Sequence, residues 1–219
     1  MSSELPLFPL NTVLFPGAPI RLHIFEDRYK RMIRSCMDEQ RPFGVVLIRR
    51  GAEALGPLAE PHTVGCSAII VNSQRLEQGR MNIVAIGQER FRILSLDSRA
   101  FPYLMGTVQP FPVEPGDQQE VSQRGDRLRG QVRRLIQTQL KAAGQVLDVT
   151  NLPEDPVELA HLAASVLQIS AEQKQQILQI VRAEDLIDRV QYIYRREQAL
   201  TESILSHGEH ESGLPFSIN

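Results

Sequence analysis

The amino-acid sequence predicts an α+β fold, with a β-rich segment at residues 5–112, a helical segment at 119–206 and a flexible tail at 207–219. Two observations support this prediction. Apolar residues alternate with a period of two in several short runs of the first segment, whereas in the second they recur every three or four residues. With 219 residues, 42% of them hydrophobic, the chain can bury one compound core or two small ones.

The β-rich segment begins with the run LPLFPLNTVLFPGAPIRLHIFEDRYKRMI at residues 5–33. Pro6 and Pro9 cannot donate ladder hydrogen bonds, so the start of this run is predicted to be an edge strand or an extended leading segment. Pro16 followed by Gly17 is typical of a type II turn, because proline presets φ and glycine accepts a positive φ.

The turn leads into a half-buried strand and then into a short helix. Alternation predicts that the inward face of the strand is formed by Ile20, Leu22 and Ile24. After Phe25 the period changes, and four residues stand at the spacing of one helix face: Tyr29, Met32, Ile33 and Cys36.

Further strands are predicted at residues 43–50, 62–76, 81–86, 89–96 and 103–111. Gly79 permits a tight reversal, and Gly87 is expected to end the strand that precedes it. In the next strand Phe91 alternates with Arg90 and Arg92. Several short strands with hairpin-length connections and one inserted helix predict a small, partly closed β-barrel or two packed sheets.

The helical segment carries two start signals. Asp155 can cap a helix that has Pro156 at its first position, and Ser170 with Gln173 forms a second capping pattern. An earlier helical stripe, weakened by two glycines, consists of Leu128, Val132, Leu135, Ile136 and Leu140. A long amphipathic helix closes the segment, with a seam made of Leu186, Val190, Ile193, Glu197, Leu200 and Ile204.

Three stretches resemble the Lon protease N-terminal domain family: the opening run, VGCSAIIVNSQRLEQGRMNIVAIGQERFRI, and DPVELAHLAASVLQISAEQKQQILQ. The resemblance covers residues 5 to about 204. It implies that the β-rich segment is a PUA-like pseudobarrel, that a C-terminal helical bundle follows, and that the domain binds substrate polypeptides. The chain is expected to be a stand-alone member without ATPase or protease domains.

Motifs of catalysis and metal binding are absent from the sequence. It contains no G-x-x-x-x-G-K-[ST], G-x-S-x-G or H-E-x-x-H pattern, so no catalytic residue and no cofactor is assigned. His207 and His210 lie near two glutamates but lack a second ligand cluster, so no metal site is assigned either. Cys36 and Cys66 are expected to be buried free thiols. A non-enzymatic protein is predicted.

The resemblance implies a polypeptide-binding module that acts as an adaptor or a holdase-like factor in protein quality control. Its expected partners are exposed segments of unfolded polypeptides, together with a separate protease or chaperone. The candidates for the contacts are Phe15, Phe25, Tyr29 and Met105. They are weak candidates, because apolar residues at alternating positions usually face the core.

The alternative is an RNA-binding module, since the PUA-like barrel is also an RNA-binding architecture and arginine outnumbers lysine. A net charge of −2 and the absence of tryptophan disfavour nucleic acid as a partner. No signal peptide and no apolar run of 18 residues is present, which predicts a soluble, cytoplasmic protein without a membrane segment.

Overall fold

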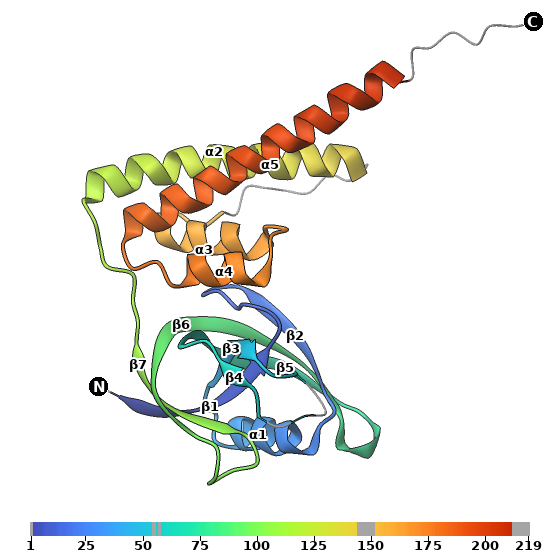
Figure 1. Cartoon of the computed structure of the whole chain (residues 1–219), viewed down its shortest axis with the longest axis vertical. Helices are drawn as coiled ribbons and strands as arrows, with labels where there is room; N and C mark the ends of the chain where they lie inside the picture. Colours follow the sequence, from blue (N-terminus) through green and yellow to red (C-terminus); the bar gives the residue numbers. More distant parts are fainter. Residues whose placement is uncertain (1, 54–55, 57, 144–151, 212–219) are drawn as a thin grey trace, which may run out of the picture.

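The computed structural model describes residues 2–53, 56, 58–143 and 152–211, with the side chains of 136–143 and 200–211 outside the description. Figure 1 shows the strands and α1 (Asp27–Asp38) in one half and the remaining α-helices in the other. The strands are β1 (Ser3–Leu10), β2 (Pro19–Ile24), β3 (Phe43–Arg50), β4 (Glu60–Pro61), β5 (Val64–Arg75), β6 (Met81–Asp97) and β7 (Leu104–Pro110).

The strands form one mainly antiparallel sheet in the order β1-β7-β6-β5-β3-β4. A parallel pairing joins β1, the first strand of this order, to β3, the last but one. β2 pairs with β6 along the edge of β6 that β7 also uses. Between β2 and β3 runs α1 (Asp27–Asp38), whose buried face is the predicted one: Tyr29, Met32, Ile33 and Cys36. The mixed α and β composition predicted from the sequence is confirmed.

β1 agrees with the prediction of an edge strand along most of its length, and in addition it joins two other strands. It pairs with β7 over residues 3–7 and with β3 over residues 7–10. Each half of β1 has only one neighbouring strand, and half of its backbone N–H positions therefore face no partner. Pro6 and Pro9 can occupy such positions without breaking the ladder.

β6 corrects the prediction, because Gly87 does not end the strand. The strand continues for 17 residues and pairs with β2 and β5 through its first part and with β7 through its last part. A side chain at Gly87 would lie 2.2 Å from the carbonyl oxygen of Phe15, so glycine lets the Phe15–Gly17 turn approach. That turn is as predicted: Gly17 has φ +74°, and the Ala18 N–H donates to the Phe15 carbonyl at 3.1 Å.

The helical half consists of α2 (Gln118–Ala143), α3 (Pro156–Val166), α4 (Ala171–Leu178) and α5 (Ala183–Glu211). Both predicted start signals are present. The Asp155 carboxylate accepts from the N–H groups of Val157 and Glu158, and Ser170 and Gln173 form a reciprocal capping box. α2 continues through Gly125 and Gly130 and packs beside α5 (Figure 1).

Buried side chains form a core that runs from the strands into the helices. On α2 and α5 it includes Leu128, Val132, Leu186, Val190 and Ile193. Leu135 belongs to the same core, and Glu197 of the predicted seam is half-buried. The side chains of Ile136, Leu140, Leu200 and Ile204, also predicted for these stripes, lie outside the description. Helix α5 continues past the predicted tail boundary at 207 to Glu211, and residues 212–219 lie outside the described residues.

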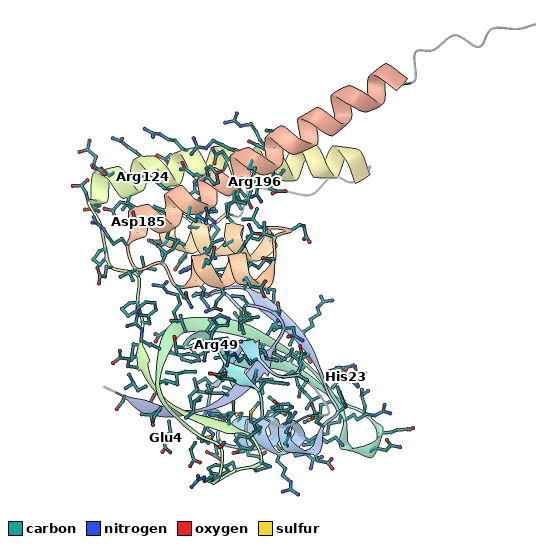
Figure 2. All side chains as sticks on the ribbon, in the orientation of Figure 1. Glu4, His23, Arg49, Arg124, Asp185 and Arg196 are labelled. Atoms are coloured by element: carbon teal, nitrogen blue, oxygen red, sulfur yellow. The ribbon has the colours of Figure 1, made fainter. Side chains whose placement is uncertain are left out.

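Several charged groups on the helical half form ion pairs or bond to backbone carbonyls. Arg124 on α2 forms ion pairs with Glu120 and with Asp188 of α5, and Figure 2 shows it among the side chains at the periphery. Arg129 donates to the backbone carbonyls of Leu152 and Glu154. Among the helices that the structure describes, none combines the length and hydrophobicity that crossing a bilayer would require.

Candidate functional site

The four side chains predicted as polypeptide contacts lie in different parts of the sheet half. Phe15, Tyr29 and Met105 are buried in the main core, whereas Phe25 is 45% exposed. Phe25 and Tyr29 border the same hollow of about 270 Å³, whose floor includes the Phe8 ring stacked on Tyr29 at 4.1 Å. Of the four predicted residues, Phe25 is therefore the one whose side chain is exposed enough to contact a polypeptide.

A groove of about 570 Å³ lies between the end of α1 and one edge of β5. Five consecutive β5 residues, 69–73, form one wall, and the other wall includes Met37 and Arg41. Over residues 69–75, β5 pairs with β6 but not with β3, which contacts β5 only at residues 66–68. Among the strands that the structure describes, none pairs with this edge of β5 along the groove.

The unpartnered edge of β5 offers apolar side chains in addition to its polar backbone groups. Val71 sits at a register shift in the β5–β6 pairing and is 55% exposed, and Ile69 and Ile70 beside it are half-buried. An exposed strand edge offers N–H and C=O groups to an extended segment, and neighbouring side chains offer apolar contacts. Sequence reasoning missed this site. The available signal was the run Ile69-Ile70-Val71, in which a strand must turn at least one β-branched residue outward.

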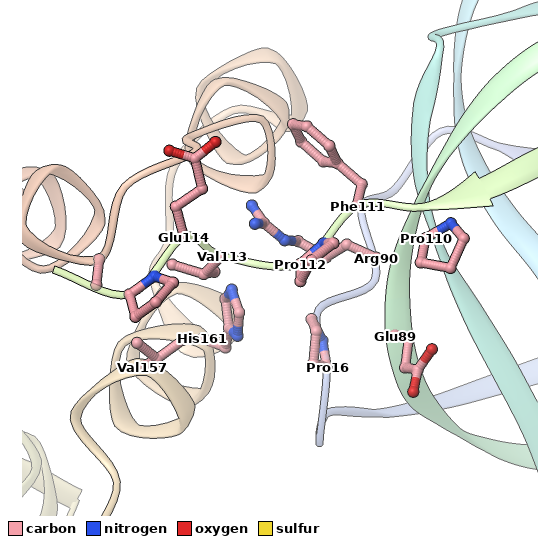
Figure 3. Close-up of a pocket in the computed structure, with 12 residues that line it drawn as sticks. Pro16, Glu89, Arg90, Pro110, Phe111, Pro112, Val113, Glu114, Val157 and His161 are labelled. Carbon is pink, nitrogen blue, oxygen red and sulfur yellow. The ribbon is translucent and has the colours of Figure 1, made fainter. Parts of the chain in front are cut away.

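A cavity of about 530 Å³ lies between the sheet half and the helical half (Figure 3). Much of its wall is apolar and stiff, because four prolines line it: Pro16, Pro110, Pro112 and Pro115. The segment after β7 runs along the cavity and is held to the loop before α5, where Glu114 exchanges backbone hydrogen bonds with Val181 and Ala183 at 2.7 and 3.1 Å. Glu89 and Glu114 line the cavity with exposed side chains.

Arg90 links the two halves at this cavity. The alternation of β6 places Arg90 on the same side as the exposed Arg92, yet Arg90 is only 3% exposed. Its Nη1 donates to the carbonyl oxygens of Leu178 at 2.7 Å and Ile180 at 2.6 Å, just where α4 ends. The guanidinium also lies over the Phe111 ring, 4.9 Å from its centroid. Burial lowers the pKa of Arg90 to about 10, which leaves it cationic at neutral pH.

His161 of α3 is the second buried polar residue of the cavity wall and is 4% exposed. Burial, and then the positive charge of Arg90, lowers the pKa of His161 to about 4, so the imidazole is neutral at pH 7. Its ring lies 6.2 Å from that of Phe15. The described part of the chain provides no hydrogen-bond partner for His161 Nε2 or for Arg90 Nη2, although both atoms are buried.

The described residues provide neither a cluster of metal ligands nor a reactive thiol. Across the described residues, no three His, Cys, Asp or Glu side chains gather closely enough to hold a metal ion. The side chains of His207 and His210 lie outside the description. Cys36 and Cys66 are free and buried, as predicted, and burial raises their pKa values to about 11 and about 12, which keeps both thiols protonated.

Comparison with known proteins gives one consistent result. A family model described as the ATP-dependent protease La (LON) substrate-binding domain matches residues 4–196. A Lon protease of Anaeromyxobacter dehalogenans is 26% identical over 198 residues, which are 90% of this chain and 23% of that protein. Lon protease 2 of Myxococcus xanthus is 28% identical over 179 residues, 81% of this chain and 22% of that protein. The chain thus spans about a quarter of the length of these relatives.

Two solved structures share the fold. The Lon N-terminal domain protein from Xanthomonas campestris superposes with a TM-score of 0.64 at 24% identity, covering 86% of this chain and 96% of that one. The N-terminal domain of the Mycobacterium avium complex Lon protease gives a TM-score of 0.67 at 20% identity, covering 88% and 97%. At these identities the likeness concerns the fold.

Proposed function

The chain belongs to the ATP-dependent protease La (LON) substrate-binding domain family, and on this premise we propose that it is a non-enzymatic module that binds exposed segments of other polypeptides. The family description supports the substrate class. The adaptor or holdase-like role in protein quality control and the cytoplasmic location are parts of the same proposal. So are the PUA-like pseudobarrel at residues 5–112 and the separate helical subdomain at 119–206.

The edge of β5 beside the α1 groove is the observation that carries this proposal. An extended segment laid along residues 69–73 would pair with unpartnered backbone groups over about 16 Å, at about 3.3 Å per residue. Met37, Ile69 and Ile70 line the same groove and would contact alternate side chains of the segment. Backbone pairing recognises any extended chain, which suits a module with many clients. Phe25 is a further candidate contact, in the separate hollow beside β2.

Val71→Lys is expected to weaken binding of an unfolded model polypeptide by about tenfold, because a solvated charge at the strand edge opposes strand addition. Since Val71 is 55% exposed, the substitution is expected to change the free energy of unfolding by less than about 0.5 kcal/mol. Fluorescence anisotropy with a labelled, permanently unfolded polypeptide measures the affinity, and urea denaturation checks the stability.

Leu94→Lys is the matched control, because Leu94 is an aliphatic strand residue with 53% exposure that does not line the groove. Equal losses in the two variants would contradict binding at the β5 edge. The same titration from about 50 to 500 mM salt, with a single-stranded RNA as competitor, tests the partner class. Apolar and backbone contacts lose little affinity with salt, whereas RNA affinity falls with a slope of about 0.7 per phosphate contact on a double-logarithmic plot. Steeply salt-dependent binding of RNA alone would replace this proposal.

A further inference from the structure

Two buried nitrogen atoms of the cavity between the halves have unused hydrogen-bonding capacity. Arg90 Nη2 and His161 Nε2 have no hydrogen-bond partner among the described residues, although the two residues are only 3% and 4% exposed. Figure 3 shows Arg90 reaching in from the sheet half and His161 from a helix of the other half, and both residues line the cavity. A buried polar atom without a partner costs about 1–3 kcal/mol, and more when it is charged, so such a pair calls for an explanation.

The guanidinium is fixed in place before any ligand arrives. Arg90 Nη1 is held by two carbonyl oxygens at the end of α4, and the Phe111 ring lies against the guanidinium plane. No acidic side chain of the described chain forms an ion pair with Arg90. Within the described residues, its positive charge is therefore stabilised by carbonyl dipoles and by the face of the Phe111 ring, without a carboxylate partner. A negatively charged oxygen in the cavity would complete the set, and charge-assisted hydrogen bonds are the stronger kind.

The remaining walls restrict which anion fits. Pro16, Pro112, Val113 and Val157 make an apolar surface suited to an aliphatic or aromatic group next to the charge. Glu89 and Glu114 line the cavity with exposed carboxylates, which repel every anion but repel a phosphate chain or another polyanion more strongly than a single carboxylate. A single carboxylate attached to an apolar group satisfies both conditions.

We propose that this cavity binds a carboxylate carried by an apolar residue, as at the C-terminus of a polypeptide, with Arg90 and His161 as its hydrogen-bond donors. This inference deepens the proposed polypeptide-binding function and rests on it for the choice of a polypeptide as the source. A free small acid with an apolar group offers the same chemistry. The two sources are separated in the experiment below.

The test compares two labelled peptides with the same sequence ending in leucine, one with a free C-terminal carboxylate and one with a C-terminal amide. The free acid is expected to bind the full chain about ten to a hundred times more tightly, the range for one charge-assisted hydrogen bond. N-acetyl-leucine serves as a competitor. Competition by N-acetyl-leucine at the concentration that works for the unlabelled peptide would support the carboxylate site with a small acid as its source.

Variants locate the binding. His161→Leu is expected to reduce the preference for the free acid about fivefold, whereas His62→Leu, at a partly exposed position outside the cavity, should leave it unchanged. Val157→Trp keeps both donor side chains but places a large ring in the cavity, one turn before His161 on the same face of α3, and should also remove the preference. This second variant guards against misfolding of the His161 variant. The ring signals of His161 in a nitrogen–proton NMR spectrum should shift with the free acid and not with the amide.

Equal affinities for acid and amide would overturn the carboxylate site. In that case the proposed function would still hold if the unmodified chain bound the unfolded polypeptide and Val71→Lys lowered the affinity. An acid preference that survives both Val157→Trp and His161→Leu would also overturn the assignment, since the carboxylate would then bind elsewhere.

Discussion

Replacing Arg90 by methionine is expected to lower the free energy of unfolding by about 3–5 kcal/mol. Two hydrogen bonds from a charged donor are lost, each contributing about 1.5–3 kcal/mol, and the carbonyl oxygens of Leu178 and Ile180 lose these donors in a mostly buried place. Methionine keeps a similar length and an apolar stem, so the cavity left behind is small. Urea denaturation followed by circular dichroism measures the change in midpoint and slope.

Arg92→Met is the matched control, because Arg92 also lies over the Phe111 ring, at 4.3 Å, but is exposed to solvent. Its loss is expected to cost less than about 1 kcal/mol. Arg90→Lys should fall in between, since a single ammonium cannot reproduce the guanidinium fork. If Arg90→Met and Arg92→Met lowered the free energy of unfolding equally, the hydrogen bonds from β6 to the end of α4 would not contribute the predicted stability.

His161 is expected to make the protein less stable as the pH falls from about 6.5 to about 4. An unfolded histidine has a pKa of about 6.5, and burial lowers the pKa of His161 in the folded protein to about 4. Between these values the unfolded chain takes up a proton that the folded chain refuses, so the unfolded state gains stability. The full difference is about 3 kcal/mol, reached near pH 4 and absent above pH 7.

The measurement is the difference in unfolding free energy between the unmodified chain and His161→Gln, taken every half pH unit from 4 to 7. Carboxylates titrate in both proteins and cancel in the difference. The gap between the two curves should change by about 3 kcal/mol in favour of the variant on acidification. Parallel curves for His161→Gln would contradict a buried neutral imidazole.

Local features of this fold followed from the sequence because they depend on neighbours in the chain. The buried face of α1, the turn at Pro16-Gly17 and the caps at Asp155 and Ser170 all involve groups within about four residues of each other. Period and capping chemistry are short-range properties, so the residues themselves specify them. The family membership also followed from the motifs, and the match to residues 4–196 confirms it.

Tertiary packing decided which strands meet and which polar groups are buried. β1 lies between β7 and β3, and β6 passes through Gly87, because partners far along the chain pair with them. Arg90 looked like the outward residue of an alternating strand, and its burial depends on carbonyl groups 88 and 90 residues away. The candidate sites share this origin, since the free edge of β5 and the cavity at Arg90 and His161 exist only where distant segments stop pairing or come together. Period alone reports which side of a strand a residue faces, and only the folded chain determines what covers that side.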